Sequence, residues 1–463
     1  MDHGTKLGLL GIYLSIFAHT LMFSTLFPVV GQTLMDFKPL IARSELGKYY
    51  STLNGGFFLG EFLCFPIQLY LCSKLGLRLL HLLSILSTLL FSLLISYSTT
   101  YDSLITLRFL QGLCCPVIYS SLRLLKAHFP QKAENFVQRF YLLGLCAGFF
   151  LGGSMDTVSI MGSSEHLACN LVVVVLAGVS FVLCLKYGKL VGGRRGGGIE
   201  EEEEGGQGSL LGIFIEIVEA FKVKGIFQAV AVYLLCCVAG TGFDLMVLWM
   251  LASQETYGFN GDAQKLTKVL FFSSFGMLCF TFIYYKGIVS KLGSIQTCKK
   301  ALKLSAICFF VIPIASIAHL NYNGMFVSLS LGCLLYFTSQ LIAETAVFGL
   351  IGSLSSYNSG LTTQDVSLAL SKITRALSVY LFSLSFADHV TNKSYPFNFA
   401  YTFNVMTLIL GGTFLVCFTL RQADQSMVAP KPRKVLDSLL DPSVETLEIP
   451  VKSSELKVMS SNK

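Results

Sequence analysis

The chain has 463 residues, of which 53% are hydrophobic and only 13% are charged, and its mean hydropathy is +0.66. Soluble domains carry roughly 25% charged residues, so this composition excludes a water-soluble globular protein. The formal net charge of +7 does not indicate nucleic-acid binding, because the Lys and Arg residues lie in loops between apolar runs and report orientation in a membrane.

Twelve apolar runs follow one another along the chain, six before a long polar interval and six after it. A bilayer core of about 30 Å requires roughly 20 residues of helix, and a helix satisfies its own backbone groups in lipid. The expected spans lie near residues 7–31, 47–72, 79–98, 103–127, 137–157, 167–187, 226–251, 268–289, 299–320, 324–352, 365–387 and 398–420. The sequence therefore predicts an all-α polytopic membrane protein with twelve transmembrane helices, in which residues 1–187 and 226–420 each form a six-helix bundle.

A four-residue pattern, Ser-Lys-Leu-Gly, occurs in the loop between the second and third spans of each half. It covers Ser73–Gly76 in the first half and Ser290–Gly293 in the second, nearly half the chain length apart. Equivalent loops at that separation are typical of transporters that are built from internal repeats. The pattern predicts two similar halves.

Residues 188–225 separate the halves and are Gly-rich, with five consecutive Glu residues at 200–204. This composition cannot bury apolar area, so we expect a flexible cytosolic linker followed by an amphipathic helix around 209–224 at the membrane interface. The Glu run is interpreted as a solvated tether, with cation binding as the alternative. Residues 421–463 are polar and are expected to form a disordered cytosolic tail.

Basic residues in the loops at 74–78, 123–139, 186–195 and 286–303 fall on one side of the predicted membrane, which places both termini and the linker in the cytosol. Asn392 begins an N-glycosylation sequon in the loop between the last two spans, which this orientation puts outside the cell or in a lumen. The location stays open between the plasma membrane and an endomembrane of vacuolar or lysosomal type.

Three short patterns stand out in the first half. The loop at 69–78 reads LYLCSKLGLR, span four contains RFLQG at 108–112, and span five contains GLCAGFFLGG at 144–153. Together with twelve spans in two sixes, they resemble the signatures G-x-L-a-D-R-x-G-R-K, R-x-x-Q-G and G-x-x-x-G-P-x-x-G-G of the major facilitator superfamily. The residues in register are Lys74, Gly76, Arg78, Arg108, Gln111, Gly112, Gly144, Gly148, Gly152 and Gly153.

The chain departs from these signatures at four positions. Leu69, Ser73 and Leu77 stand where Gly, Asp and Arg are usual, and Phe149 stands where Pro is usual. Among the branches of the superfamily, the chain most resembles the zinc-induced-facilitator-like and drug:proton antiporter branch. The glycines of span five, at four-residue spacing, let a neighbouring helix approach closely, and plain packing and a gating role both remain open for them.

The resemblance implies that Ser73, Lys74, Gly76 and Arg78 form a gating loop. Lys74 and Arg78 are expected to make cytosolic contacts that stabilise the outward-facing state, and Gly76 permits the tight turn between spans. Ser73 replaces the usual acidic residue, which weakens this latch and biases the gate toward the inward-facing state.

Ionisable side chains within the predicted spans are few, and each is a functional candidate because a charge there costs at least about 2.5 kcal/mol. They are His19, Glu61, Arg108, Asp244, Glu344, Lys372 and Arg375, with the polar neighbours Gln111 and Gln340. A buried carboxylic acid is suited to carry a proton, and Glu344 and Asp244 are the expected carriers. Arg108 is expected to act in coupling or in substrate binding, with a structural ion pair as the alternative.

The sequence leaves more than one partner open for the remaining ionisable residues. Glu61 is expected either to pair with Arg108 or to have no partner, and His19 either lines the cavity or is a hydrogen-bonded packing residue. Lys372 and Arg375 are expected to lie a turn inside the outer membrane face and to extend their head groups toward it.

The resulting hypothesis is a secondary active transporter that exchanges protons for a small organic solute by alternating access, as the resemblance to antiporters implies. A transport-inactive sensor or scaffold with the same fold, a uniporter and a symporter remain alternatives. The expected partners are the solute, protons and the lipid bilayer, for a monomer that binds no nucleic acid.

Enzyme classes are not supported by any pattern in the chain. The sequence contains no phosphate-binding Gly loop, no H-E-x-x-H and no nucleophile elbow, so neither catalytic residues nor ATP-driven pumping is predicted. We expect no cofactor and no metal site. The 14 Cys residues are scattered through the apolar runs and are interpreted as packing residues, with a redox or soft-metal pair as the alternative.

Overall fold

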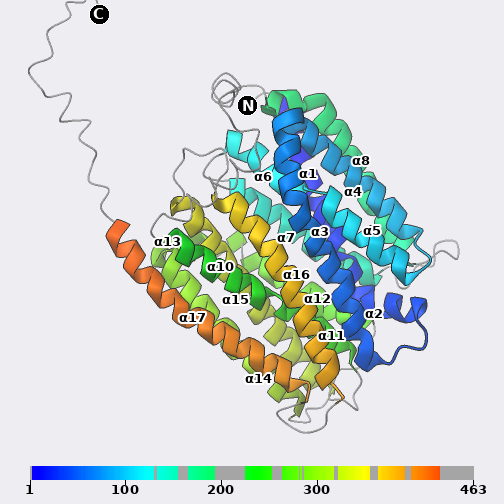
Figure 1. Cartoon of the computed structure of the whole chain (residues 1–463), viewed down its shortest axis with the longest axis vertical. Coiled ribbons are helices and arrows are strands. Elements are labelled where there is room, and N and C mark those ends of the chain that lie inside the picture. Colours follow the sequence, from blue (N-terminus) through cyan, green and yellow to red (C-terminus); the bar gives the residue numbers. More distant parts are fainter. Residues whose placement is uncertain are drawn as a thin grey trace, which may run out of the picture.

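The computed structural model describes residues 3–129, 133–154, 165–192, 225–252, 263–280, 282–283, 286–317, 322–354, 363–391 and 398–427, and the regular elements in these ranges are helices (Figure 1). The Glu run at 200–204, the helix expected around 209–224, Asn392 and the end of the tail, 428–463, lie outside the described residues.

The helices of the first half occupy the six predicted positions. They are α1 (His3–Ser24), α2 (Leu26–Phe37), the short 3-10 helix η1 (Arg43–Glu45), α3 (Leu46–Leu75), α4 (Leu77–Ser96), α5 (Tyr101–Cys114), α6 (Val117–His128), α7 (Ala133–Ser154) and α8 (Glu165–Gly192). The helices of the second half are α10 (Ile226–Gly240), α11 (Gly242–Leu251), α12 (Ala263–Phe280), α13 (Lys286–Leu292), α14 (Ser294–Ile317), α15 (Tyr322–Leu354), α16 (Thr363–His389) and α17 (Ala400–Met427).

Three predicted spans are each formed by two consecutive helices. α1 and α2 meet at Thr25, α5 and α6 meet at Pro116, and α10 and α11 meet at Thr241. Pro116 has no backbone N–H and its ring clashes with the preceding turn, which ends α5. Thr241 lies between Gly240 and Gly242, and Gly is the residue that favours a helix interior least after Pro.

Within the described residues, eight spans are long and apolar enough to cross a membrane by length and composition. α7, α12, α14 and α16 occupy the other four of the twelve positions. α16 is less apolar than a typical membrane helix because it carries Asp365, Lys372 and Arg375.

The two halves pack through two equivalent pairs of helices. α3 packs along α16, and α7 packs along α12 (Figure 1). α3 and α12 are the second spans of their halves, whereas α7 and α16 are the fifth, so each contact joins a second span to a fifth. Two bundles related by an internal repeat produce this arrangement.

The repeated Ser-Lys-Leu-Gly loops have the same backbone geometry. Gly76 and Gly293 both have a φ of 76°, which an L-residue with a Cβ rarely adopts. The N–H of Gly76 donates to the Cys72 carbonyl at 3.0 Å, and that of Gly293 donates to the Val289 carbonyl at 2.8 Å. Each glycine therefore ends one helix and allows the next to begin.

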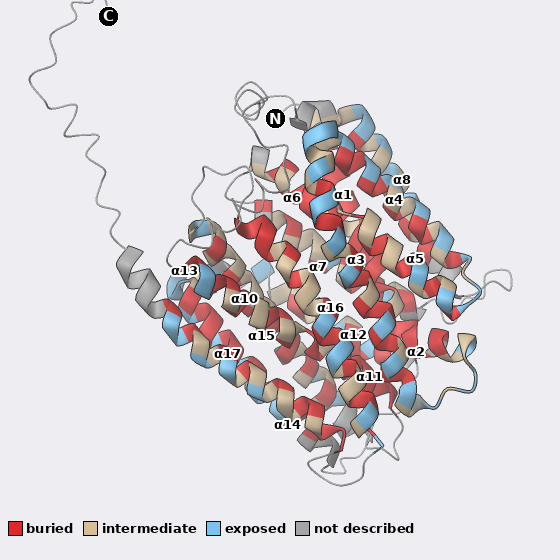
Figure 2. Cartoon of the chain, viewed as in Figure 1, coloured by how far each residue is buried: buried red, intermediate tan, exposed pale blue. Residues whose placement is uncertain are grey.

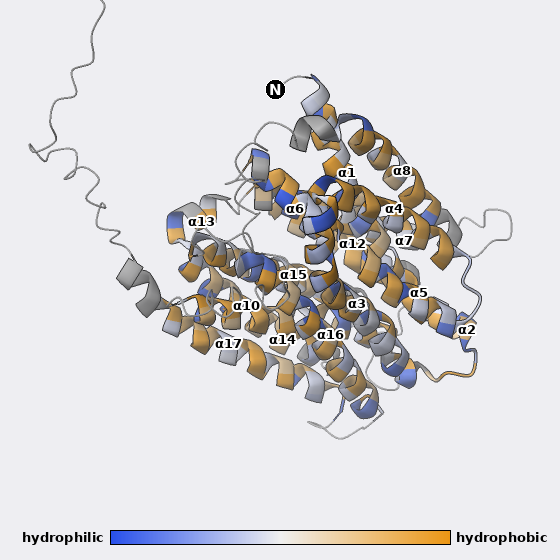
Figure 3. Ribbon diagram, turned by 45° about the horizontal axis from the view of Figure 1, so that its top comes forward, coloured by the Kyte–Doolittle hydropathy of each residue, from blue (hydrophilic) through white to orange (hydrophobic). Residues whose placement is uncertain are grey.

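The outer faces of the bundles are apolar. Large hydrophobic side chains stand exposed at helical spacing along α4 and α17, the faces that Figures 2 and 3 show as exposed and hydrophobic. On α4 they are Leu79, Leu83, Leu86, Leu90 and Leu94. Such a stripe is unfavourable in water and is what a helix presents to lipid.

The two ends of the molecule differ in their packing. The linker end is the end at which α3, α6 and α8 finish and α10 begins, and the far end is the end at which α3 begins. The core of the second half continues into the far-end part of the first half without a break, through residues such as Phe27, Phe149 and Trp249. At the linker end, a small apolar cluster of Phe65, Tyr119 and two α16 residues contacts both halves.

Candidate functional site

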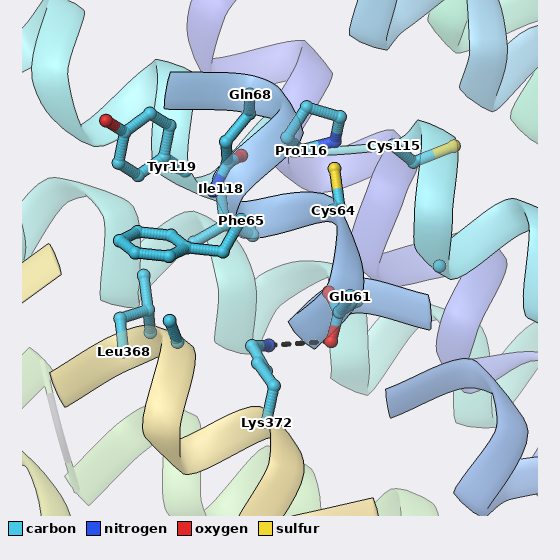
Figure 4. A pocket seen from close by; sticks show the side chains of 12 residues that line it. Glu61, Cys64, Phe65, Gln68, Cys115, Pro116, Ile118, Tyr119, Leu368 and Lys372 are labelled. Carbon is cyan, nitrogen blue, oxygen red and sulfur yellow. Dashed lines mark ion pairs between the residues drawn. The ribbon is translucent and has the colours of Figure 1, made fainter. Parts of the chain in front are cut away.

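The centre of the molecule holds an ion pair between the two halves. Glu61 of α3 and Lys372 of α16 meet with Oε2 2.8 Å from Nζ, and their side chains are 12% and 21% exposed (Figure 4). His19 of α1 is buried beside them, with Nε2 3.9 Å from the other Glu61 oxygen. The expectation that Glu61 pairs with Arg108 or with nothing is wrong, because the close packing of α3 on α16 brings an ammonium group within reach.

A cavity of about 40 Å³ lies on the linker-end side of this pair (Figure 4). Glu61 and Lys372 line it together with Cys64, Gln68 and Tyr119 and with neighbouring apolar side chains. A cavity holds a water molecule from roughly 10–15 Å³ upward, so this one has room for a few. The ion pair therefore borders, on one side, a space that is large enough for water.

A second ion pair lies within the second half. Arg375 of α16 donates from Nη2 to Oε2 of Glu344 on α15 at 2.7 Å, and Gln340 donates to the other Glu344 oxygen at 3.3 Å. Gly240 makes room for this carboxylate, since a Cβ there would lie 2.7 Å from Oε1 of Glu344. Gln340 also donates to the Cys236 carbonyl, which ties α15 to α10.

The expectation for the two basic residues of α16 is therefore wrong. Lys372 and Arg375 do not extend toward a membrane face, since each points at a carboxylate in the interior. Each cation instead has an opposite charge within 3 Å, and the two charges attract each other in the interior.

Asp244 of α11 forms a second polar contact between the halves, nearer the far end. The Tyr50 hydroxyl donates to Asp244 Oδ1 at 2.6 Å, and Asn54 Nδ2 donates to the same oxygen at 3.3 Å. Both donors lie on α3. Sequence reasoning identified Asp244 and missed Tyr50 and Asn54, because the residues before Glu61 read as ordinary polar positions of a span.

Arg108 of α5 is 2% exposed and lies inside the first half. Its guanidinium donates to Gln111 Oε1 at 2.5 Å and to the Phe23 carbonyl at 3.3 Å. Its Cζ lies 4.9 Å from the Phe57 ring centroid and 5.6 Å from that of Phe23. Arg108 and Gln111 line a separate cavity of about 20 Å³ together with Asn170.

Polar contacts join the halves at the linker end. Arg123 of α6 donates to Asp365 of α16 at 2.8 Å, and its Cζ lies 4.8 Å from the Tyr119 ring centroid. Lys126 donates to Gln364 at 2.6 Å. Gln138 of α7 also donates to Thr345 of α15. Arg123, Lys126 and Asp365 were not predicted as site residues because they lie at span ends, where a charge ordinarily reads as part of a loop.

The far end is held by apolar packing instead. Phe243 of α11 packs against Phe27 and Phe149 of the first half, with ring centroids 4.9 and 5.5 Å apart. Gly47 of α3 lies so close to α16 that a Cβ would be 2.5 Å from the Ser383 carbonyl oxygen. Contacts between the halves are thus present at both ends, and the ionisable groups of the centre lie between them.

The predicted gating loop makes its described side-chain contacts within the first half. Ser73 donates to the Tyr70 carbonyl of its own helix at 2.8 Å, Lys74 is exposed, and Arg78 donates to the Leu185 carbonyl of α8 at 2.9 Å.

The glycines of span five face α1. A Cβ at Gly144 would lie 2.7 Å from the Phe17 carbonyl oxygen, and one at Gly152 would lie 2.4 Å from that of Thr25. Gly148 lies equally close to Ser24, and Gly153 follows on the same helix. Gly144, Gly148 and Gly152 have no space for a side chain, whatever further role they have.

Metal-binding geometry is not present in the described part of the chain, where no three His, Cys, Asp or Glu side chains converge. The arrangement offers instead a carboxylate that bridges the two bundles, a second one that is hydrogen-bonded between them, and a buried guanidinium beside a small cavity.

Comparison with known proteins identifies the fold. The family model of the Major Facilitator Superfamily matches residues 12–387. A crystal structure of the human organic anion transporter MFSD10 (TETRAN) is similar with a TM-score of 0.64 and 14% identity, over 90% of this chain and 100% of that one. A crystal structure of a D-xylose-proton symporter is similar with a TM-score of 0.65 and 12% identity, over 90% of this chain and 97% of that one. Comparison of the sequence with curated proteins gives no match.

Proposed function

We propose, from the premise that this chain belongs to the Major Facilitator Superfamily, that it is a secondary active transporter which exchanges protons for a small organic solute. The observation that carries the proposal is the Glu61–Lys372 ion pair, which joins α3 of one half to α16 of the other. A titratable contact at that boundary makes the position of the halves depend on a proton.

The proposed coupling follows from charge. When Glu61 is ionised, it attracts Lys372 and holds α3 against α16. A proton on Glu61 removes that attraction and leaves the ammonium group without its partner, which weakens the contact between the halves. Asp244 acts in the same direction nearer the far end, because it too joins the halves through a carboxylate.

The linker end is the proposed opening. Its contacts are polar, and water or solute groups can replace them when the halves part, whereas opening the far end exposes a continuous apolar core. Opening the linker end therefore costs less free energy. The cavity beside Glu61 lies on that side and gives the proton its route.

Proteoliposomes with an imposed pH gradient test the proposal. The similar structures suggest two first substrates, D-xylose and a fluorescent organic anion such as fluorescein, with the luminal pH followed by pyranine. We expect a pH gradient to drive solute movement against the direction of proton flow. We expect Glu61→Gln to abolish this dependence, and Glu344→Gln to reduce it.

Glu45→Gln is the matched control, because Glu45 is an exposed carboxylate of the first half outside the centre. Solute flux that is indifferent to the pH gradient and unchanged by Glu61→Gln would reject proton coupling. Solute and protons moving in the same direction would replace exchange by symport.

A transport-inactive sensor or scaffold is the second candidate. It is favoured by Ser73, which hydrogen-bonds its own helix where the superfamily signature has an acidic residue. Ser73→Asp separates the two candidates. A transporter with a weakened latch gains or loses flux on this change, whereas a scaffold shows no flux in either form with a broad panel of solutes.

A further inference from the structure

We propose that the cavity beside Arg108 and Gln111 binds a small anionic group, of the size of a carboxylate or a chloride ion, and that this anion balances the charge of Arg108. The inference deepens the proposed function and rests on it only for the source of the anion, which is either the transported solute or the medium.

Arg108 is a buried cation that has no carboxylate partner among the described residues. Arg108 is 2% exposed, and a guanidinium buried in a membrane helix normally faces a carboxylate. Among the described residues, no carboxylate lies within 4.0 Å of Arg108. The nearby Glu61 is already held by Lys372.

The other central carboxylates are also engaged elsewhere. Glu344 is paired with Arg375, and Asp244 accepts hydrogen bonds from Tyr50 and Asn54 of α3. The protein thus supplies Arg108 with neutral hydrogen-bond acceptors and aromatic ring faces. These groups orient the guanidinium but do not neutralise its positive charge.

Gln111 and Arg108 each have an N–H group without an acceptor in the described structure. Because an arginine can only donate, the oxygen of Gln111 faces Arg108 and the amide Nε2 points away from it. In the described structure, neither Gln111 Nε2 nor Arg108 Nε has a hydrogen-bond partner, and both atoms are inaccessible to solvent. Two neighbouring residues therefore present unused N–H groups, one of them cationic, and this chemistry recognises an anion and repels a cation.

The volume of the cavity limits the size of the anion. Arg108 and Gln111 line a cavity of about 20 Å³, to which Thr25 and Asn170 add polar side chains. One water requires roughly 10–15 Å³, so the cavity accepts a chloride ion or the carboxylate head of a larger molecule and excludes a whole organic solute. The rest of its wall is apolar, which strengthens the attraction between the guanidinium and an anion.

Thermal unfolding of the purified full-length protein tests the inference. The protein is prepared in sodium sulfate at constant ionic strength, because sulfate is neither a carboxylate nor as small as chloride, and sodium chloride or sodium benzoate then replaces the sulfate stepwise. We expect a saturable rise in Tm with at least one of the two probes. We expect the apparent Kd to rise at least tenfold in Arg108→Lys, which keeps the charge and loses the planar fork, and in Gln111→Leu.

Arg139→Gln is the matched control, because Arg139 is a guanidinium of α7 that packs on the Phe282 ring, away from the cavity. Its Kd should equal that of the unchanged protein. If Arg108→Lys fails to fold, Gln111→Leu carries the test alone, since it leaves the cation in place.

The two probes distinguish the possible sources of the anion. Saturation by chloride assigns the anion to the medium, and saturation by benzoate alone assigns it to an organic carboxylate. No saturable shift with either probe, or the same Kd in Gln111→Leu as in the unchanged protein, overturns the inference. Anion binding without gradient-driven transport rejects the proposed function and leaves this site standing, because the binding measurement needs no gradient.

Discussion

Glu61 and Lys372 join the two halves of the molecule through a single contact of 2.8 Å between a carboxylate and an ammonium group. The carboxylate belongs to the second span of the first half and the ammonium group to the fifth span of the second half, and these helices pack along each other. The contact lies between a polar linker end and an apolar far end. A change of charge at this point therefore acts on the boundary that must move in alternating access.

The pair itself is testable by a double-mutant cycle. Glu61→Gln leaves Lys372 buried without its partner, and Lys372→Met leaves Glu61 without the ammonium group, with His19 at 3.9 Å. Breaking a buried pair from one side costs about 3–5 kcal/mol, and we expect the lower part of that range because both side chains are partly exposed. The double mutant should be more stable than either single mutant. Thermal or denaturant unfolding in detergent measures this, and additive effects would show that the two side chains are not coupled.

The linker-end contact gives a second prediction. Arg123→Asp places two carboxylates where Arg123 and Asp365 now meet at 2.8 Å, so the halves should part at this end. Cys64 lines the cavity behind the contact and is 4% exposed. In a background without the other cysteines, its labelling by N-ethylmaleimide should accelerate about tenfold, which corresponds to ~1.4 kcal/mol of gate stability.

The reversed pair is the control for this gate. Arg123→Asp with Asp365→Arg restores opposite charges and should return the labelling of Cys64 toward its original rate. Equal labelling in the single variant and the unchanged protein would mean that this ion pair does not hold the linker end closed.

The close approach of α7 to α1 gives a third prediction, with a control of opposite sign. A methyl group at Gly144 meets the Phe17 carbonyl oxygen at 2.7 Å, so Gly144→Ala should destabilise the protein by about 1–3 kcal/mol. Gly56 lies inside α3 with nothing within 4 Å of a Cβ, so Gly56→Ala should be neutral or stabilise by about 0.5–1 kcal/mol. Unfolding midpoints of the two variants decide this, and a loss at Gly56 as large as at Gly144 would refute the packing account.

The repeated loop was predictable from sequence because its cause is local. A glycine between two apolar runs favours a tight turn, and Gly76 and Gly293 share the positive φ that such a turn requires. The order of spans was also predictable, since hydropathy and length determine whether a segment crosses a membrane. These features depend on residues that are neighbours in the chain.

The pairing of charges was not predictable in the same way. Hydropathy places Lys372 and Arg375 at a depth in the membrane and contains no information on which way they face around the axis of α16. That direction is determined by α3 and α15, which are distant in sequence and supply Glu61 and Glu344. Tyr50 was missed for the same reason, because its hydroxyl becomes part of a site only when α11 brings Asp244 against it.

The Tyr50 contact supports the last prediction. Tyr50→Phe removes the shorter of the two hydrogen bonds to Asp244 and leaves a buried carboxylate with Asn54 alone, which should cost about 1–3 kcal/mol of stability. In an Asp244→Leu background the same change should cost less than about 1 kcal/mol, because no carboxylate then lacks a donor. Tyr101→Phe serves as the comparison, since its hydroxyl donates to a backbone carbonyl of Tyr49 at the far end. If Tyr50→Phe is equally destabilising with and without Asp244, the hydroxyl matters for reasons other than this carboxylate, and Asp244 loses its place as a contact between the halves.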